Sequence, residues 1–518
     1  MNAGKKLDLV HDLVLPTLLF AALGGMTWAV RGCSGFGASA GCIFAGVMWG
    51  AAWWFISRDP GQEPTRRYTS AWIVLAMTVG FGLSGNRGWM QWPSFFEGKM
   101  QTNYAAGEFV PISRVYGFVW LFIAGMPWAG VAACFLAWCG SLRETRVWHW
   151  AIRLACGFGG ALLARYLYHE CPQYFLPMYE SLAERYQDLE HNPNLRRLIN
   201  DSGLAILHMG FYLGLLAYEV VRRDWKNVVL ISTVGILNGA GWAVCQNWKW
   251  AAGVWPNANF NWWRCWESSG GISIGIALGV AYFLVNRPMS EQERATFRSR
   301  RSIAGPNLEW LVVFLGLTGL FGAMTLAVGN TWTRIHLGVG LVFGVVYYVL
   351  RRHEYANDLA PPATGSSTKL LASDVYGDPN LERFGLYVGL LYGLGASLRN
   401  GLKGWFNIYR GNEDYWSAVL WQIFGPLFLL CLLTICGWVL LRPLPRNFRG
   451  DAFPHAQGLM WLVLIVQNVI AQLVTVPHRQ WNEVAFSIYY LLLFAITAVI
   501  VIHYAERNRD IARTSETC

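Results

Sequence analysis

The segment GGMTWAVRG at residues 24–32 closes an apolar run of membrane-spanning length and stops on an arginine and a glycine. Nearly the same line recurs as GAGWAVCQN at 239–247 and as GAMTLAVGN at 322–330. Looser versions stand at 80–88, 157–165 and 393–401. A sequence motif that recurs at the ends of apolar runs indicates a repeated membrane-helix unit, because repeat architectures are recognised by internal repeats in the sequence.

The composition is that of a membrane protein. Hydrophobic residues make up 54% of the 518 residues and charged residues only 14%, whereas a soluble protein carries about 25% charged residues. The 55 glycines agree with this assignment, since glycine is more frequent in membrane helices than in soluble ones. We therefore predict an integral membrane protein of a plasma membrane, such as the bacterial inner membrane, in which the lipid bilayer is the main partner.

The apolar runs predict an all-α polytopic protein with about fourteen transmembrane helices in a single domain over residues 1–518. The predicted spans are 12–30, 38–56, 70–85, 115–139, 150–168, 203–221, 228–245, 269–286, 308–328, 335–350, 384–399, 417–441, 457–476 and 484–503. If the N-terminus is cytoplasmic, the inner segments hold 25 Lys and Arg in 124 residues and the outer loops 13 in 123. This bias matches the positive-inside rule, so both termini are predicted to be cytoplasmic. It also explains the net charge of +10 without a nucleic-acid partner.

The spans read as consecutive helical hairpins. Each repeated line ends an odd-numbered span at the outer side, and several even-numbered spans are glycine-spaced, as in GGISIGIALGV at 270–280. Small residues let membrane helices approach closely, so this pattern alone predicts a tightly packed bundle. The hairpins form two pseudo-repeat groups, 1–286 and 308–503. The remaining segments are the inner linkers 287–307 and 351–383, the outer Trp-rich loop 246–268 and an outer amphipathic segment 178–200.

Charged residues gather where the hairpins meet the outer side. Arginines close odd-numbered spans and carboxylates open even-numbered ones, at equivalent points of different hairpins. Helix capping and ion pairing between hairpins explain each of them individually, but as a set they predict an outer vestibule that binds an anionic or polar solute. The predicted binding residues are Arg31, Arg87, Arg399, Arg479, Glu267 and Glu483.

Tryptophans supply the predicted walls of this vestibule. The stretch WKWAAGVWPNANFNWWRCWE at 248–267 holds six of them, with Asn, Arg and Glu interleaved. Aromatic faces beside charged groups are typical of solute-binding sites, and we assign Trp263, Trp266 and Trp405 to the walls. A folded loop with a small core of its own explains the same stretch. Cys245 and Cys265 flank it at one membrane face, where an oxidising compartment would permit a disulfide.

The middle of the predicted bundle holds few polar residues. Three amides in the span 457–476, Gln467, Asn468 and Gln472, either line a polar path or join helices by hydrogen bonds. Charged residues deep in the spans are scarce, which argues against a proton pump. The chain has no P-loop, C-x-x-C pair, haem-attachment motif or H-E-x-x-H, so we predict no cofactor and no metal.

Three functions remain open. The first is a transporter or channel-like protein for a small polar or anionic solute, because many-span bundles with internal repeats are typical of transporters. The second is a membrane enzyme that acts at the outer face on a glycan or lipid-linked substrate, with carboxylates as general acid and base. The third is a scaffold subunit of a membrane complex that binds protein partners through the Trp-rich loops.

Overall fold

The part of the protein that the structure describes is mostly helical in its computed structural model. The structure describes residues 8–33, 38–58, 65–70, 72–85, 92–143, 147–258, 260–300, 453–475 and 481–516. Four predicted spans, 308–328, 335–350, 384–399 and 417–441, and the linker 351–383 lie outside these residues.

Each of the other ten predicted spans coincides with a helix of the structure. These helices are α1 (Leu15–Cys33), preceded by the π-helical turn η1 (Val10–Val14), α2 (Ala38–Ser57), α3 (Trp72–Ser84), α5 (Val115–Trp138), α6 (Val147–Glu170), α9 (Pro193–Val221), α10 (Trp225–Cys245), α12 (Trp262–Val285), α19 (Phe453–Thr475) and α20 (Trp481–Glu516). Six helices in the described part of the chain are long and apolar enough to cross a membrane, and α2, α3 and α19 contain shorter apolar helices.

Short elements join the long helices. They are α4 (Trp92–Phe95), α7 (Pro172–Phe175), α8 (Ala183–Gln187), α11 (Trp248–Val254) and α13 (Glu291–Arg300), with the strands β1 (Lys99–Asn103) and β2 (Glu108–Pro111). The strands pair antiparallel with Lys99 opposite Pro111, so the all-α prediction is corrected by one small hairpin. The segment 178–200 contains α8 and the first turns of α9. Pro193 opens α9, since proline is well suited to the first helical position.

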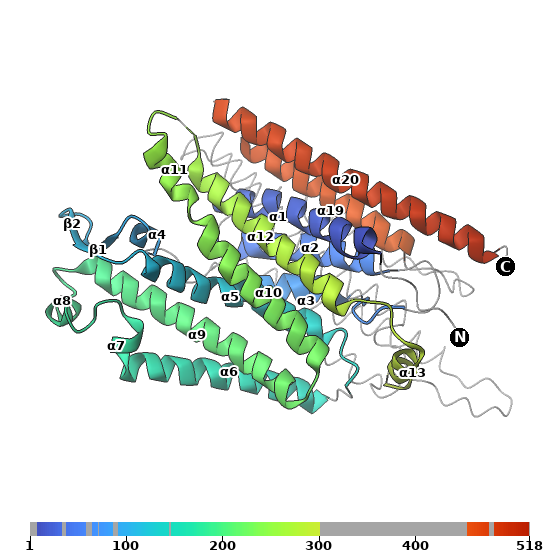
Figure 1. The fold of residues 1–518 in the computed structure, drawn as a ribbon, viewed down its shortest axis with the longest axis horizontal. Helices are drawn as coiled ribbons and strands as arrows, with labels where there is room; N and C mark the ends of the chain where they lie inside the picture. Colours follow the sequence, from blue (N-terminus) through green and yellow to red (C-terminus); the bar gives the residue numbers. More distant parts are fainter. Residues whose placement is uncertain are drawn as a thin grey trace, which may run out of the picture.

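The described helices run alongside one another, and η1 and the end of α20 lie at the same end of the bundle (Figure 1). The hydroxyl of Tyr504 in α20 donates to the carbonyl of His11, which fixes this arrangement. We call this end the termini face, and α13 belongs to it. The strand hairpin, α8 and α11 lie at the opposite end, which we call the loop face (Figure 1).

Glycines make the closest helix contacts. A Cβ atom added at Gly24 in α1 would lie 2.1 Å from the carbonyl oxygen of Gly271 in α12. A Cβ at Gly160 in α6 would lie 2.3 Å from the carbonyl of Gly210 in α9. Any larger residue would push these helices apart, so the small-residue stripes bring about the predicted close packing. The predicted hairpin partners α1 and α2, and α10 and α12, contact each other, but α1 packs most extensively against α12, which is far from it in sequence.

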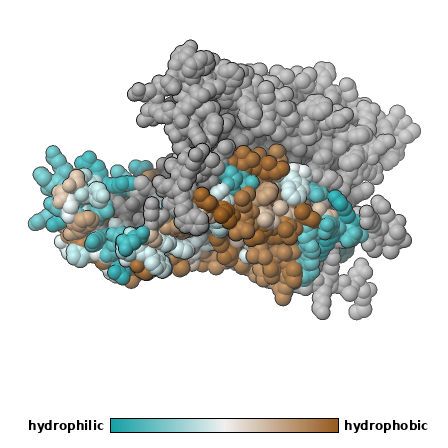
Figure 2. Space-filling view, turned by 90° about the horizontal axis from the view of Figure 1, so that it is seen from above, coloured by the Kyte–Doolittle hydropathy of each residue, from teal (hydrophilic) through white to brown (hydrophobic). Residues whose placement is uncertain are grey.

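The outer surface of the described helices is apolar over most of its length. Figure 2 shows a hydrophobic band between hydrophilic ends. On α6, Leu162 is 69% exposed and Phe158 60%, and on α20 Val499 is 65% exposed. Exposed side chains of this size are expected where a helix faces lipid rather than water. The surface therefore agrees with an integral membrane protein.

Candidate functional site

Two residues of the predicted vestibule, Arg31 and Glu267, form a buried ion pair at the loop face. Arg31 lies in the last turn of α1 and Glu267 in the second turn of α12. Their Nη1 and Oε2 atoms are 3.0 Å apart, and the side chains are 4% and 2% exposed. The contact between Gly24 and Gly271 sets this distance. The two helices are antiparallel, so Arg31, which follows Gly24, and Glu267, which precedes Gly271, both lie on the loop-face side of that contact.

Every nitrogen of the Arg31 guanidinium donates a hydrogen bond, and Nη1 donates to Glu267. Its Nε donates to the sulfur of Cys42 at 3.3 Å, and its Nη2 donates to the carbonyl oxygen of Gly85 at 3.1 Å. These contacts tie together α1, α2, the end of α3 and α12. A planar fork with several donors suits this role, which lysine cannot perform. Arg31 therefore positions the carboxylate of Glu267, and each of its three nitrogens already donates one hydrogen bond within the bundle.

Tryptophan rings surround the pair. The Arg31 guanidinium carbon lies 4.6 Å from the ring centre of Trp28 and 5.8 Å from that of Trp128. Trp128 packs against Trp242 with ring centres 4.8 Å apart, and Trp242 stacks on Trp266 at the same distance. Trp263 meets Trp266 edge-on at 4.7 Å. A continuous row of indoles thus leads from Arg31 to the Trp-rich loop.

Several polar atoms beside this row have no hydrogen-bond partner among the described residues. They are the indole nitrogens of Trp28 and Trp242 and both amide atoms of Gln246. Trp28 and Gln246 are 0% exposed, and Trp242 is 1% exposed. Gln246 follows Trp242 by one helical turn, which places both on one side of the chain. Buried polar atoms are normally paired, so this group has hydrogen-bonding capacity for a polar molecule.

The structure thus joins part of the predicted site. It brings together Arg31, Glu267 and Trp266, with Trp263 at the edge. Arg87, Arg399, Arg479 and Trp405 lie outside the described residues, and Glu483 is in α20 without a described side chain. Sequence reasoning missed Trp28, Trp128, Trp242 and Gln246. Trp28 and Trp242 stand inside the repeated line itself, at 24–32 and 239–247, so the recurrence of that line was the signal that pointed to them.

Two of the three amides of α19 join helices. Gln467 donates to the carbonyl of Leu23 in α1 at 2.9 Å. Gln472 donates to the carbonyl of Ser487 in α20 at 3.1 Å. Asn468 keeps a buried amide oxygen without a hydrogen-bond partner among the described residues. The bonds of Gln467 and Gln472 are those of helix–helix adhesion, one of the two interpretations of these amides.

The Trp-rich loop has a small aromatic cluster of its own. Trp262 stacks with Trp248 and Trp255, with ring centres 6.2 and 5.7 Å apart. The indole of Trp250 donates to the carbonyl of Phe96 at 3.0 Å. Trp255 is nevertheless 55% exposed. The loop therefore combines a folded interior with exposed rings at the loop face.

The predicted disulfide is not formed. Cys245 and Cys265 are both free thiols. The sulfur of Cys245 is within hydrogen-bonding reach of Ser269, which lies one helical turn beyond Cys265 in α12.

A second buried ion pair lies toward the termini face. The Nε of Arg153 in α6 donates to Oε1 of Glu219 in α9 at 2.7 Å, and both side chains are 0% exposed. Asn227 donates to the other carboxylate oxygen at 3.0 Å and accepts from the hydroxyl of Tyr68 at 2.7 Å. Nη1 and Nη2 of Arg153 have no hydrogen-bond partner among the described residues.

Neither metal ligation nor similarity identifies the site. The described residues contain no cluster of His, Cys, Asp or Glu suited to a metal ion. Comparisons with protein-family models, with curated proteins and with solved structures gave no match. The function must therefore be argued from the geometry alone.

Proposed function

We propose that this protein is a multi-pass membrane carrier or channel-like protein for a small polar or anionic solute, and that the solute binds beside the Arg31–Glu267 pair. The observation that carries the proposal is the set of unpartnered buried atoms next to the pair, the indole N–H groups of Trp28 and Trp242 and the amide of Gln246. Most of these atoms are donors, which suits carboxylate, phosphate or hydroxyl oxygens. Indole faces around them exclude water, as in other small-molecule sites.

The membrane arrangement is part of the same proposal. The chain carries about fourteen helices as consecutive hairpins, and the basic bias places the termini face in the cytoplasm and the loop face outside. The proposed solute site then lies toward the outer side, beside the ends of α1 and α12. Alternation between the two faces is typical of transporters built from repeated helices.

The alternative functions have narrower support. An enzyme at the outer face needs two carboxylates at one pocket, and among the described side chains Glu267 is the only carboxylate hydrogen-bonded to Arg31. A scaffold role draws on the exposed rings of the Trp-rich loop, of which Trp255 is the most exposed.

A solute screen on the full-length protein in detergent tests the proposal. Small organic anions and sugars are ranked by the rise in melting temperature that binding produces. Trp242→Phe keeps the ring and removes one open donor, and Gln246→Leu removes the amide, so each should weaken solute binding about tenfold. Trp54→Phe is the matched control, because its indole nitrogen is also buried and unpartnered among the described residues but lies toward the termini face, at the end of α2.

Each outcome of the screen decides between the functions. Uptake of the stabilising solute into proteoliposomes, lost in Trp242→Phe and kept in Trp54→Phe, supports the carrier. Chemical conversion of the solute would support the enzyme instead. If no solute stabilises the protein, or if all three variants respond alike, a solute site beside Arg31 is wrong.

A further inference from the structure

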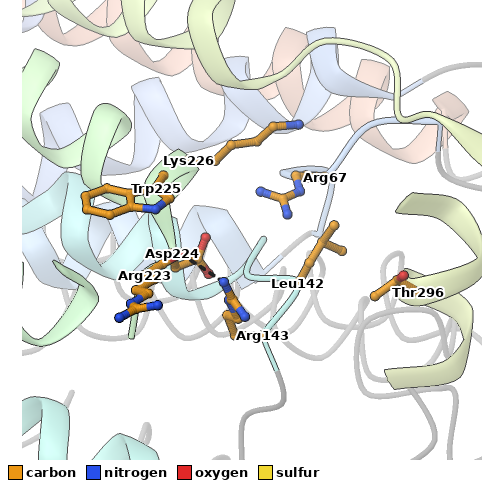
Figure 3. Close-up of a pocket in the computed structure, with 8 residues that line it drawn as sticks. All are labelled: Arg67, Leu142, Arg143, Arg223, Asp224, Trp225, Lys226 and Thr296. Carbon is orange, nitrogen blue, oxygen red and sulfur yellow. Dashed lines mark hydrogen bonds between the residues drawn. The ribbon is translucent and has the colours of Figure 1, made fainter. Parts of the chain in front are cut away.

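A basic cavity lies at the termini face, at the other end of the bundle from the proposed solute site. Its volume is about 290 Å³, and its walls come from four separate segments of the chain. These are the α2–α3 connection with Arg67, the α5–α6 connection with Arg143, the α9–α10 turn with Arg223 and Lys226, and α13. Figure 3 shows these four cationic side chains around Asp224 and Leu142, with Thr296 of α13 across the gap.

Hydrogen bonds hold the cavity in shape. The backbone of Arg223 has a φ of +56°, a left-handed conformation that few non-glycine residues adopt. Nη2 of Arg143 donates to the carbonyl of Arg223 at 3.1 Å, which fixes that turn. Asp224 accepts from the hydroxyl of Ser141, so its carboxylate is already engaged. These bonds hold the side chain of Arg143 and the backbone of the α9–α10 turn in place beside the cavity.

The cavity has an excess of positive charge. Two carboxylates accompany its four cations, Asp224 in the wall and Glu293 of α13. Glu293 accepts from Lys226 at 2.7 Å and lies 3.9 Å from Nε of Arg67. That Nε is buried and has no hydrogen-bond partner among the described residues. The guanidinium of the exposed Arg223 forms no ion pair with them either.

We propose that this cavity binds a phosphate group, supplied either by the headgroup of an anionic lipid or by a soluble phosphate ester. Arginine forks recognise phosphate oxygens in two places at once, and three arginines and a lysine border this space. The exposed Trp225 and the apolar Leu142 stand beside the charges, an arrangement that suits the membrane–water interface. Basic pockets between helices on the cytoplasmic side are known to receive lipid phosphates.

Glu293 competes with the phosphate for Lys226 and Arg67. Its carboxylate is held over the cavity by a capping box, in which the amide of Ser290 donates to Glu293 and the amide of Glu293 donates to Ser290. Binding of a phosphate therefore requires α13 to release this contact. Removal of the negative charge at Glu293 favours the bound state.

The test uses the full-length protein and two kinds of probe. Glycerol 3-phosphate, titrated into protein in phosphatidylcholine nanodiscs, represents the soluble source. Phosphatidic acid, counted by native mass spectrometry against phosphatidylcholine, represents the lipid source. Arg223→Gln should weaken whichever probe binds by about tenfold. Arg287→Gln is the matched control, because it removes one exposed arginine at the same face without lining the cavity.

Glu293→Gln should change the affinity for the probe in the opposite direction from Arg223→Gln. Glutamine keeps the capping box and loses the competing charge, so affinity for the bound probe should rise several-fold. The proposal is overturned if neither probe binds, if Arg223→Gln and Arg287→Gln weaken binding equally, or if Glu293→Gln weakens it. The probe that binds identifies the source of the phosphate.

Discussion

The two buried arginine–glutamate pairs of this bundle differ in how the arginine is hydrogen-bonded. In the pair at the loop face, the three nitrogens of Arg31 donate to Glu267, Cys42 and the carbonyl of Gly85. In the pair toward the termini face the carboxylate is saturated, because Glu219 accepts from both Arg153 and Asn227. The loop-face pair is therefore held mainly through the hydrogen bonds of its arginine, and the second pair through those of its carboxylate.

Aromatic rings compensate for the missing hydrogen bonds of Arg153. Its guanidinium carbon lies 5.2 Å from the ring centre of Trp138, 5.5 Å from that of Trp150 and 5.9 Å from that of Tyr218. Cation–π contacts of this kind are worth about 2 kcal/mol when they are desolvated. The pair at the loop face thus orders four segments, whereas the second pair joins α6 to α9 inside an aromatic cage.

The largest effect is expected at Arg31. Arg31→Met leaves the Glu267 carboxylate buried without its cation and the Gly85 carbonyl without a donor, so it should destabilise the protein by about 3–5 kcal/mol. Thermal unfolding in detergent measures this change. The matched control is Arg165→Met, because Arg165 is exposed on α6, and it should stay within about 0.5 kcal/mol. Equal stability of the two variants would show that the loop-face pair contributes nothing.

A smaller effect is expected at Glu219. Glu219→Gln keeps the size of the side chain and one acceptor but removes the charge that faces Arg153, and the expected loss is about 2 kcal/mol. The double variant Arg153→Met with Glu219→Leu should regain stability, since well-packed apolar residues often replace a buried pair without loss. If the double variant is less stable than Glu219→Gln, the ion pair contributes more to stability than apolar packing inside the aromatic cage can replace.

The smallest effect is expected at the half-exposed pair Lys226–Glu293, which serves as a reference for both buried pairs. Burial alone would raise the pKa of Glu293, but hydrogen bonds from Lys226 and from the amide of Ser290 hold the pKa below its ordinary value. Its contribution is therefore complete above pH 4.5, the ordinary value, and is lost as the pH falls through the lower folded value. Solvent screening limits it to under about 1 kcal/mol.

Thermal unfolding of the wild type and of Glu293→Gln at pH 7 and at pH 3 isolates this contribution. The wild type should be the more stable protein at pH 7, and the difference should shrink at pH 3. A difference that grows on acidification would mean that Glu293 is stabilised in its protonated form.

The sequence alone located the helices and part of the site. Apolar runs in the sequence predicted the positions of the ten long described helices, six of which are long and apolar enough to cross a membrane. The sequence motif that recurs at helix ends singled out Arg31. Glu267 was singled out by its place at the start of the apolar run 269–286. The spacing of the glycines predicted close helix contacts, but it did not predict which helices would contact each other.

Only the tertiary structure decided the partners. α1 pairs with α12, 236 residues apart at Arg31 and Glu267, because Gly24 and Gly271 allow their backbones to touch. Cys245 and Cys265 remained free thiols, and the basic cavity required four separate segments of the chain to meet at the termini face. A periodic pattern specifies which face of a helix is small or polar. Which other helix covers that face depends on the packing of the whole bundle, which local sequence does not encode.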